Sequence, residues 1–406
     1  MKFGGSSVAD ADKIKNVARR VLAKQKEGRR VVVVVSAPGD MTDDLIEMAD
    51  KISLNPSERE MDMLLSTGEQ VSIALLGIAM AELGVKAVSL TGPQAGIHAD
   101  DNHTRARITK IVPTKIQHEL AKNKIVIVAG FQGLNPNHDI TTLGRGGSDL
   151  TAVALAAALR ADCEIYTDVK GVYTTDPRVV QEAQKLNHIS YDEMLELAGS
   201  GSQVMQARSI EVAKKFGVEL QVRSTFSTEE GTWIVQEVPN MEAVVVSGIA
   251  FDKNQAKVSI LDVKDQPGVA AKIFGILAEN KVNVDMIIQS AAKDRSNDIS
   301  FTIARTDLRK ALPLLEQVQK LLGAKTVSYD EKIAKVAIVG VGMRSHPGVA
   351  AKMFETLSKE KINIEMISTS EIKIACVVAL ENCDPAVRAL HKAFGLGQAK
   401  QGKKKH

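Results

Sequence analysis

The chain has 406 residues, of which 44% are hydrophobic, 25% charged and only 3% aromatic, and its formal net charge is +3. This length predicts two or three domains, and the small charge with few stacking side chains argues against a nucleic-acid-binding protein. The apolar runs are too short to span a membrane. Three cysteines without metal-site spacing predict reduced thiols in a cytosol-like compartment.

Strand and helix signals alternate through the first half of the chain. Apolar residues at helical spacing end at Gly28, and five valines follow at 31–35, as in a strand covered on both faces. Further strands are expected at 85–90, 125–128 and 164–168, with helices at 71–83 and 150–159. This order predicts an α/β domain with a mostly parallel sheet, whose ligands bind beyond the carboxyl ends of the strands.

A short polar segment, Gly144-Arg145-Gly146-Gly147-Ser148-Asp149, separates one of these strands from the helix expected to begin near Leu150. The planar guanidinium of an arginine matches a carboxylate or a phosphate. Glycines allow backbone N–H groups to approach an anion at a helix start, where the helix dipole favours negative charge. The segment therefore predicts a site for small anions.

The second half contains an internal repeat. The hexapeptide Pro-Gly-Val-Ala-Ala-Lys at 267–272 recurs at 347–352, displaced by 80 residues, and the same register pairs Phe274 with Phe354, Asn283 with Asn363 and Met286 with Met366. Each copy predicts a strand (258–263 and 336–341), a Pro-Gly loop, a helix with one buried face and a second strand. We interpret the repeat as a duplication. The predicted domains span 1–237, 238–325 and 326–394, with a disordered tail at 395–406.

Five motifs together carry a family resemblance. They are Lys2-Phe3-Gly4-Gly5-Ser6-Ser7, the segments 36–42, 67–69 and 144–149, and the segment 167–178 from Thr167-Asp168 to Pro177-Arg178. In this order, and followed by the repeat, they resemble the aspartate kinases (aspartokinases), which are amino acid kinases with a C-terminal pair of ACT domains. The resemblance implies a three-layer αβα kinase domain followed by two α+β, ferredoxin-like ACT domains.

The resemblance also implies an activity. ATP, with Mg²⁺, would phosphorylate the β-carboxylate of L-aspartate to 4-phospho-L-aspartate, the first step toward lysine, threonine and methionine. Lys2 would place its ammonium between the β- and γ-phosphates, beside the amides of Gly4 and Gly5, although no Walker P-loop is present. Asp149 would organise the reaction centre, because a carboxylate substrate is already nucleophilic and needs no general base. No separate protein metal site is expected.

The resemblance also implies, position by position, which residues bind the substrate and the nucleotide. Arg145 would grip the aspartate α-carboxylate and Glu69, read as the start of a helix, its ammonium group. The further substrate-binding candidates are Ser36, Thr42, Gly146, Gly147 and Ser148. The further ATP-binding candidates are Ser6, Thr167, Asp168, Tyr173, Asp176, Arg178 and Gln203.

From the residue types alone, a purely structural role remains possible for several of these candidates. Arg145 could form a loop salt bridge, Asp149 could cap its helix and Glu69 could compensate a helix dipole. Two positions depart from the family: Gln203 stands where many relatives have lysine, and only Met1 precedes Lys2. The second departure suggests a clipped first strand or a processed form of the chain as an expectation.

The repeat suggests regulation. Asp265 and Gly268 lie where a strand ends and a helix opens, so the exposed amides there suit an amino-acid carboxylate while Asp265 or Asp285 takes its ammonium. By resemblance the effector is lysine, threonine or both, bound where ACT pairs of two subunits meet. Ser345 is the counterpart of Asp265, so the two copies differ. The predicted effector residues are Asp265, Gly268, Asn283, Asp285, Gln289, Asn363 and Glu371.

Two other functions stay open. One is a catalytically silent amino-acid sensor, although Lys2, Arg145, Asp149 and Asp168 would then have no use. The other is an amino-acid kinase with another acyl substrate. The expected protein is a homodimer or higher oligomer that binds neither nucleic acid nor membrane. We expect it in the cytoplasm, or in the plastid stroma if the source is a plant or alga.

Overall fold

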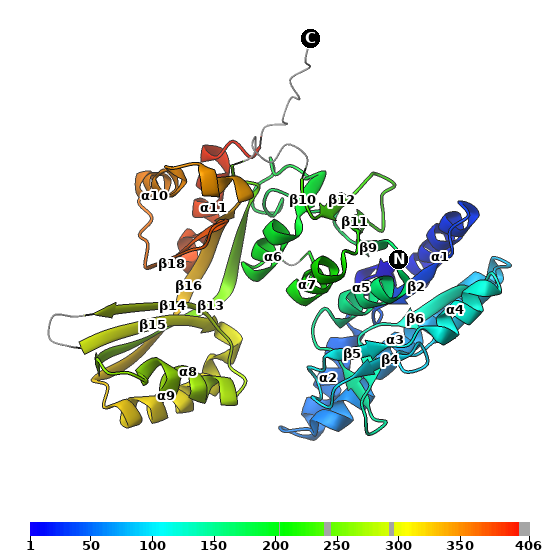
Figure 1. Cartoon of the computed structure of the whole chain (residues 1–406), viewed down its shortest axis with the longest axis horizontal. Helices are drawn as coiled ribbons and strands as arrows, with labels where there is room; N and C mark the ends of the chain where they lie inside the picture. The colour runs from blue at the N-terminus through cyan, green and yellow to red at the C-terminus, as the bar shows by residue number, and fades with distance from the viewer. Residues whose placement is uncertain (203, 239–244, 292–295, 398–406) are drawn as a thin grey trace, which may run out of the picture. The chain divides into compact units, whose positions relative to one another are not determined.

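The structure is a computed structural model that describes every residue except 203, 239–244, 292–295 and 398–406. The predicted domain boundary near 237–241 and the tail from 398 therefore lie largely outside the described residues. The chain forms two compact units (Figure 1). The first consists of Met1–Val172, Lys185–Leu195 and Gln203–Val238, and the second of Tyr173–Gln184, Glu196–Ser202 and Pro239–His406.

An eight-stranded sheet forms the centre of the first unit, in the order β10-β12-β11-β9-β1-β2-β6-β3. All its pairings are parallel except that between β11 and β12. The mostly parallel sheet predicted from the sequence is confirmed. Its strands are β1 (Lys2–Phe3), β2 (Val32–Val35), β3 (Ala87–Leu90), β6 (Ile125–Ala129), β9 (Cys163–Thr167), β10 (His188–Ser190), β11 (Leu220–Ser224) and β12 (Thr232–Val235).

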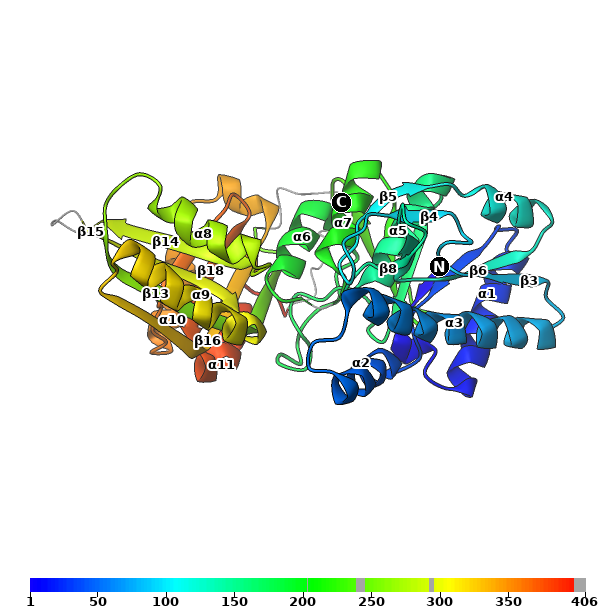
Figure 2. The ribbon, with the colours of Figure 1, turned by 90° about the horizontal axis from the view of Figure 1, so that it is seen from below.

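Helices cover both faces of this sheet (Figure 2). On one face, α1 and α3 pack on alternate residues of the central strands, including Phe3, Val33 and Ile127. On the other, α5 contacts β1, β2 and β9 and packs beside α7. The helices of this unit are α1 (Ala11–Lys26), α2 (Met41–Ile52), α3 (Glu58–Glu82), α4 (Thr114–Ala121), α5 (Gly147–Leu159), α7 (Ala207–Phe216) and the 3-10 helix η1 (Gly5–Ser7).

Two helices begin earlier than the sequence predicted. The helix expected at 71–83 extends from Glu58 to Glu82, and the helix expected near Leu150 begins at Gly147. Gly68 lies inside α3, where a Cβ atom would come within 2.7 Å of the Ala37 side chain. The close approach of another segment therefore explains this glycine. The N-cap of α5 is Gly146, whose left-handed backbone (φ 69°) suits glycine.

Helix α3 is long and apolar enough on average to satisfy the length and hydropathy criteria for a membrane span, contrary to the expectation from the sequence. In the structure it packs on β3, β6 and α1, and it carries the buried carboxylates of Asp62 and Glu69. These contacts are those of a core helix of a globular domain.

A smaller four-stranded sheet, ordered β5-β4-β7-β8, completes the first unit. Its last strand, β8, leads directly through the Gly144–Arg145 loop into α5. The small sheet therefore carries the loop on which the anion site was predicted. Its strands are β4 (Ile97–Ala99), β5 (Ile108–Ile111), β7 (Gln132–Leu134) and β8 (Ile140–Thr142).

The second unit contains a six-stranded antiparallel sheet in the order β14-β15-β13-β16-β18-β17. Its strands are β13 (Gly248–Lys264), β14 (Val284–Ala291), β15 (Ser296–Ala304), β16 (Thr326–Val339), β17 (Met366–Thr369) and β18 (Lys373–Ala379). Its helices are α8 (Val269–Glu279), α9 (Leu308–Leu322), α10 (Val349–Lys359) and α11 (Cys383–Ala393), with 3-10 turns η3 (Arg305–Asp307), η4 (Val341–Ser345) and η5 (Leu380–Asn382). Helix α6 (Tyr191–Gly199) has residues in both units.

The duplication is visible in the backbone. Gly268 and Gly348 cap α8 and α10 with φ angles of 94° and 96°, and Lys281 and Lys361 follow those helices with φ angles of 56° and 58°. The two copies share strands, because β13 and β16 each contribute to both hydrophobic cores. The predicted cut at 325/326 thus falls at the start of a strand that serves both copies.

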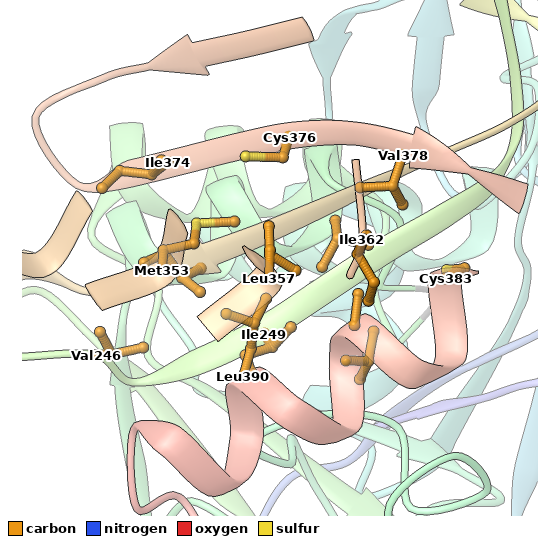
Figure 3. Packing of buried hydrophobic residues seen from close by; sticks show 14 of the residues in the cluster. Val246, Ile249, Met353, Leu357, Ile362, Ile374, Cys376, Val378, Cys383 and Leu390 are labelled. Atoms are coloured by element: carbon orange, nitrogen blue, oxygen red, sulfur yellow. The ribbon is translucent and has the colours of Figure 1, made fainter. Parts of the chain in front are cut away.

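One of these cores is drawn in Figure 3. Ile249 of β13 packs with Met353 and Leu357 of α10 and with Leu390 of α11. Cys376 and Cys383 lie in the same core, and Cys163 is buried in the first unit; all three are free thiols. Burial raises the pKa of Cys163 to about 11 and those of the other two to about 12. They are therefore protonated core residues.

Candidate active site

Lys2 and Asp149 form an ion pair at the centre of the first unit. Lys2 lies in β1 opposite Val34 and Ile165 of the neighbouring strands, so its backbone is fixed on both sides. Its Nζ atom lies 2.7 Å from Oδ1 of Asp149, and the two side chains are only 12% and 10% exposed. Asp149 is in the first turn of α5, where the helix dipole also favours its negative charge. The pair therefore presents a partly desolvated ammonium group at a helix N-terminus.

The glycine-rich segment after Lys2 approaches the loop after β2 closely. Gly5 opens η1, and a Cβ atom there would come within 2.8 Å of the Ala37 carbonyl and 2.9 Å of the Gly39 carbonyl. Only glycine fits without moving this backbone. Gly4 and Gly5 are partly buried beside Lys2, and Ser6 is exposed. These three positions agree with the predicted phosphate-binding segment, which remains a prediction.

Glu69 occupies the middle of α3, so the prediction that it begins a helix is wrong. It is only 3% exposed, and its Oε1 atom accepts the N–H of Ala37 at 3.1 Å. Its Oε2 atom is buried and accepts no hydrogen bond from the described part of the chain. Burial raises the pKa of Glu69 to about 7. A buried carboxylate with one unused oxygen is suited to receive an ammonium group.

The pKa of Glu69 gives a prediction for the pH dependence. Below about pH 7 the free enzyme carries a neutral Glu69, so kcat/KM for an ammonium-bearing substrate should fall about tenfold per pH unit. Glu69→Gln should lower kcat/KM at pH 8 and remove this dependence between pH 6 and 8. Because the folded-state pKa exceeds the unfolded one, ionised Glu69 opposes folding above pH 7. Glu69→Gln should therefore also raise the melting temperature at pH 8, and a lowered one would contradict the assignment.

Arg145 projects from a loop whose backbone is held from several sides. Gly144 and Gly146 have left-handed φ angles of 76° and 69°, and Arg145 between them is exposed. In the described chain no hydrogen bond or ion pair is found for its guanidinium, so the alternative of a structural salt bridge gains no support. A Cβ atom on Gly146 would lie 1.7 Å from the Gln206 side chain, which explains the glycine.

The remaining predicted substrate residues lie on the same elements. Ser36 follows β2, where its carbonyl accepts the hydroxyl of Ser72 at 2.7 Å, and Thr42 is the second residue of α2. Ser148 is 6% exposed in the first turn of α5 and packs against Gly130, where a Cβ atom would clash at 2.6 Å. Gly147 is buried and opens α5. All these residues belong to the first unit.

The predicted ATP-binding residues divide between the two units. Thr167 ends β9, and its hydroxyl donates to the exposed carboxylate of Asp168 at 3.0 Å in the first unit. Tyr173, Asp176 and Arg178 belong to the second unit. The Arg178 guanidinium forms a bidentate pair with Asp176, with a shortest distance of 2.7 Å, which lowers the pKa of that carboxyl group. Gln203 lies outside the described residues.

The predicted effector residues are distributed over both repeats. Asp265 and Gly268 lie between β13 and α8, and Asn297 donates to Asp265 at 2.8 Å. Asn283 and Asn363 lie just before β14 and β17, and Glu371 lies in the turn between β17 and β18. Gln289 lies inside β14, two residues before its end at Ala291.

The structure adds a pair of reciprocal ion pairs that the sequence analysis missed. Lys335 of β16 pairs with Asp285 of the first repeat, and Lys257 of β13 pairs with Glu365 of the second. Lys335 is only 2% exposed and also donates to the Gly199 carbonyl at 3.0 Å. Asp285 thus has a cationic partner already. Asp285 and Glu365 match in the 80-residue register of the repeat, but Lys257 and Lys335 are 78 residues apart, so that register does not align the two lysines.

A large cavity in the first unit lies elsewhere. It measures about 650 Å³ and is lined by residues at the amino ends of the parallel strands, including Val31, Arg160 and Cys163. None of the predicted site residues lines it. Ligands of open α/β sheets bind at the carboxyl ends, where Ser36, Gly130 and Asp168 follow β2, β6 and β9.

Comparison with known proteins agrees with this geometry. The amino acid kinase family matches residues 1–224, and ACT domains match 258–323 and 336–394. The aspartokinase of Corynebacterium glutamicum is 50% identical over 98% of this chain and 96% of its own length, and that of Pseudomonas aeruginosa is 52% identical over 99% and 98%. The chain belongs to the aspartokinases.

A solved structure supports the same assignment for both units. Escherichia coli aspartokinase III in complex with aspartate and ADP, in its R-state, matches with a TM-score of 0.83 and 27% identity over 97% of this chain and 98% of that one. The same enzyme with lysine and aspartate, in its T-state, matches with a TM-score of 0.75. The aspartokinase fold, with a kinase domain followed by an ACT pair, is thereby confirmed for this chain.

Proposed function

We propose that this aspartokinase transfers the γ-phosphoryl group of ATP to the β-carboxylate of L-aspartate. A β-carboxylate oxygen forms a bond to the γ-phosphorus while the bond from that phosphorus to the bridging oxygen breaks, and ADP leaves with the electron pair. The products are 4-phospho-L-aspartate and ADP. The main support is the 50% identity to an aspartokinase over nearly the whole chain, together with the largely buried Lys2–Asp149 pair on the same unit as Glu69 and Arg145.

Each side chain has a distinct proposed task. Arg145 binds the α-carboxylate through its planar fork, and the buried Oε2 atom of Glu69 accepts from the α-ammonium group. Lys2 neutralises charge that develops on the transferring phosphoryl group, while Asp149 holds the Lys2 ammonium in place. Catalysis thus depends on positioning two anions and neutralising their charge. No side chain needs to act as a base.

The nucleotide is proposed to bind with Mg²⁺, which would neutralise phosphate charge. Within the described residues no group of three or more His, Cys, Asp or Glu side chains could hold a metal ion. Mg²⁺ usually binds through one or two carboxylates together with substrate phosphates. Asp149 is the carboxylate that fits this role. Gly4, Gly5 and Ser6 are proposed to contact the phosphates, and Thr167, Asp168, Tyr173, Asp176, Arg178 and Gln203 the rest of the nucleotide.

A hydroxamate assay tests the function directly. Hydroxylamine converts an acyl phosphate to a hydroxamate, so product should appear with ATP, Mg²⁺ and aspartate together and should require each of them. Glutamate and N-acetylaspartate serve as matched substrates, since one has a longer side chain and the other lacks the ammonium group. Faster reaction with either one would favour the alternative acyl substrate, and no product with any of them would favour the silent sensor.

Regulation by an amino acid is the second part of the proposal. The Asp265–Gly268 turn presents a carboxylate and the N-terminal amides of α8, which match the ammonium and carboxylate groups of an effector such as lysine or threonine. We also propose a homodimer or higher oligomer formed through the ACT pair. Ile287 and Ile367, at equivalent positions of edge strands β14 and β17, are 51% and 42% exposed.

Millimolar lysine, threonine or both should inhibit the wild-type enzyme, and Asp265→Asn should raise the inhibitory concentration about tenfold, since it removes a charge-assisted hydrogen bond. Without effector its kcat and KM should stay unchanged. Glu279→Gln, at the other end of α8, is the matched control and should leave inhibition intact. Activity that is insensitive to both amino acids would refute the regulatory proposal.

A cytoplasmic location completes the proposal. It is supported by the three free, buried thiols, which need no oxidising compartment.

A further inference from the structure

We propose that Asp62 is a positioning residue that fixes the Arg145 loop for aspartate binding. The inference rests on the proposed function, because it assigns Asp62 a role through Arg145. Asp62 lies in α3, seven residues before Glu69 and on the same buried face, and its side chain is fully buried. A buried carboxylate on a helix face is costly unless several donors surround it.

Asp62 gathers donors from two separate segments. Its Oδ1 atom accepts the hydroxyl of Thr142 at 2.5 Å, and both carboxylate oxygens lie 3.0 Å from the backbone nitrogen of Thr104. Its Oδ2 atom lies 2.7 Å from Nδ1 of His103. One carboxylate therefore joins α3 to the end of β8 and to the turn at 103–104. It accepts hydrogen bonds from the Thr142 hydroxyl and the Thr104 N–H, and it also contacts the His103 ring nitrogen.

The turn at 103–104 is held in a conformation that it would not adopt by itself. Thr104 has a left-handed φ angle of 64°, which is unfavourable for a β-branched residue. Its N–H group points at the Asp62 carboxylate, so the hydrogen bonds offset this strain. Its carbonyl packs against Gly144, where a Cβ atom would lie only 3.2 Å away. The turn thus supports the residue next to Arg145.

Other hydrogen bonds at the start of the Arg145 loop also hold its backbone in place. The Thr142 carbonyl accepts the N–H of Ala106 at 2.9 Å, and the Leu143 N–H donates to the Phe131 carbonyl at 2.8 Å. Arg208 donates to the carbonyls of Leu143 at 2.8 Å and of Ala106 at 3.0 Å. Thr142 and Leu143 directly precede the Gly144–Arg145 loop, so these contacts hold its entrance. Asp62 is the only carboxylate among these described contacts, and it anchors both the turn and the strand end.

An exposed ion pair on the same helix provides a matched control for the buried contacts of Asp62. Arg59, three residues before Asp62 in α3, bonds to Asp139 at 2.7 Å, just before β8. That pair also joins α3 to the β7–β8 hairpin, but the Arg59 side chain is 48% exposed. Loss of an exposed pair has a small effect. Asp139→Asn therefore controls for general loosening between the two elements.

Asp62→Asn is the principal test. It keeps the shape of the side chain but places an N–H₂ group against donors, which should displace Thr104 or Thr142. We expect the KM for aspartate to rise roughly 10- to 100-fold, as for other small displacements of a binding group, with the KM for ATP within twofold of wild type. Thr142→Val should act in the same direction, and Thr142→Ser, which retains the hydroxyl, should restore wild-type values. Asp139→Asn should leave both constants unchanged.

A double-mutant cycle separates positioning from a merely structural role. If Asp62 acts through Arg145, Asp62→Asn should change the aspartate KM by less than about twofold in an Arg145→Ala background. An equal fold-change in both backgrounds, equal increases in both KM values, or an unchanged aspartate KM in Asp62→Asn would overturn the inference. If Asp62→Asn fails to fold, the Thr142 variants in both backgrounds decide. Failure of the proposed function itself would appear separately, as no hydroxamate from the wild-type enzyme.

Discussion

Replacing Arg145 with alanine should raise the KM for aspartate by about 100- to 1,000-fold, because truncating one member of a charged pair costs several kcal/mol. Arg145 is exposed in the ligand-free chain, so its removal breaks no contact found among the described residues and should not change the melting temperature. Arg145→Lys should recover only part of the affinity, since lysine lacks the planar fork. The measurement is steady-state kinetics with aspartate varied at saturating ATP.

The Arg145 prediction has a control and a clear contradiction. Arg29→Ala removes an equally exposed guanidinium near the amino edge of the sheet, where Arg29 lies 4.0 Å from Asp162, and should leave all constants unchanged. The KM for ATP should be unaffected in both variants. If Arg145→Ala raised the ATP KM and spared that for aspartate, Arg145 would be a phosphate ligand.

Replacing Lys2 with alanine should lower kcat about 100- to 1,000-fold, the range seen when one donor to developing negative charge is removed. The ammonium group is nearly buried and paired with Asp149 at 2.7 Å, so water cannot replace it at the same position. The KM for aspartate should change little. Saturating concentrations of both substrates are needed, so that kcat and not affinity is compared.

Two further variants complete the Lys2 experiment. Lys13→Ala removes a lysine that pairs with Asp10 at 3.1 Å on the surface, and should have no effect. Asp149→Asn should lower kcat in the same direction, because the Lys2 ammonium then lacks its fixed partner. An equal loss from Lys13→Ala, or a Lys2→Ala enzyme with wild-type kcat, would refute the catalytic role.

Local patterns in the sequence located β2, β3, β6 and β9 of the central sheet, whereas β10, β11 and β12 were not predicted. The valine run at 31–35 and the apolar segment at 125–128 became β2 and β6, since strands buried on both faces are almost uniformly apolar. The beginnings of α3 and α5 were missed for different reasons. The first part of α3 was not predicted because Gly68 and the polar residues around it, which face the candidate site, interrupt the apolar pattern. The start of α5 at Gly147 was not predicted because glycines precede Leu150.

The candidate site residues were proposed by resemblance, and their arrangement was not predictable from spacing. Lys2 and Asp149 are far apart in the chain and meet because β1 pairs beside β2 and β9 while α5 packs across these strands. Asp62, Arg208 and Lys335 were overlooked. Asp62 and Glu69 share one helix face, and two acidic residues on an otherwise apolar face were the available signal.

Apolar periodicity and the 80-residue repeat by themselves predicted the α/β class of the first half and the duplication in the second, because both depend on local patterns, whereas the ACT identity came from the family resemblance. Only the tertiary structure decided the environment of each charge. It buried Glu69 and so raised its pKa to about 7, paired Asp176 with Arg178, and shared β13 and β16 between the two ACT cores. Burial and partner choice depend on which distant segments meet, and that follows from packing of the whole chain.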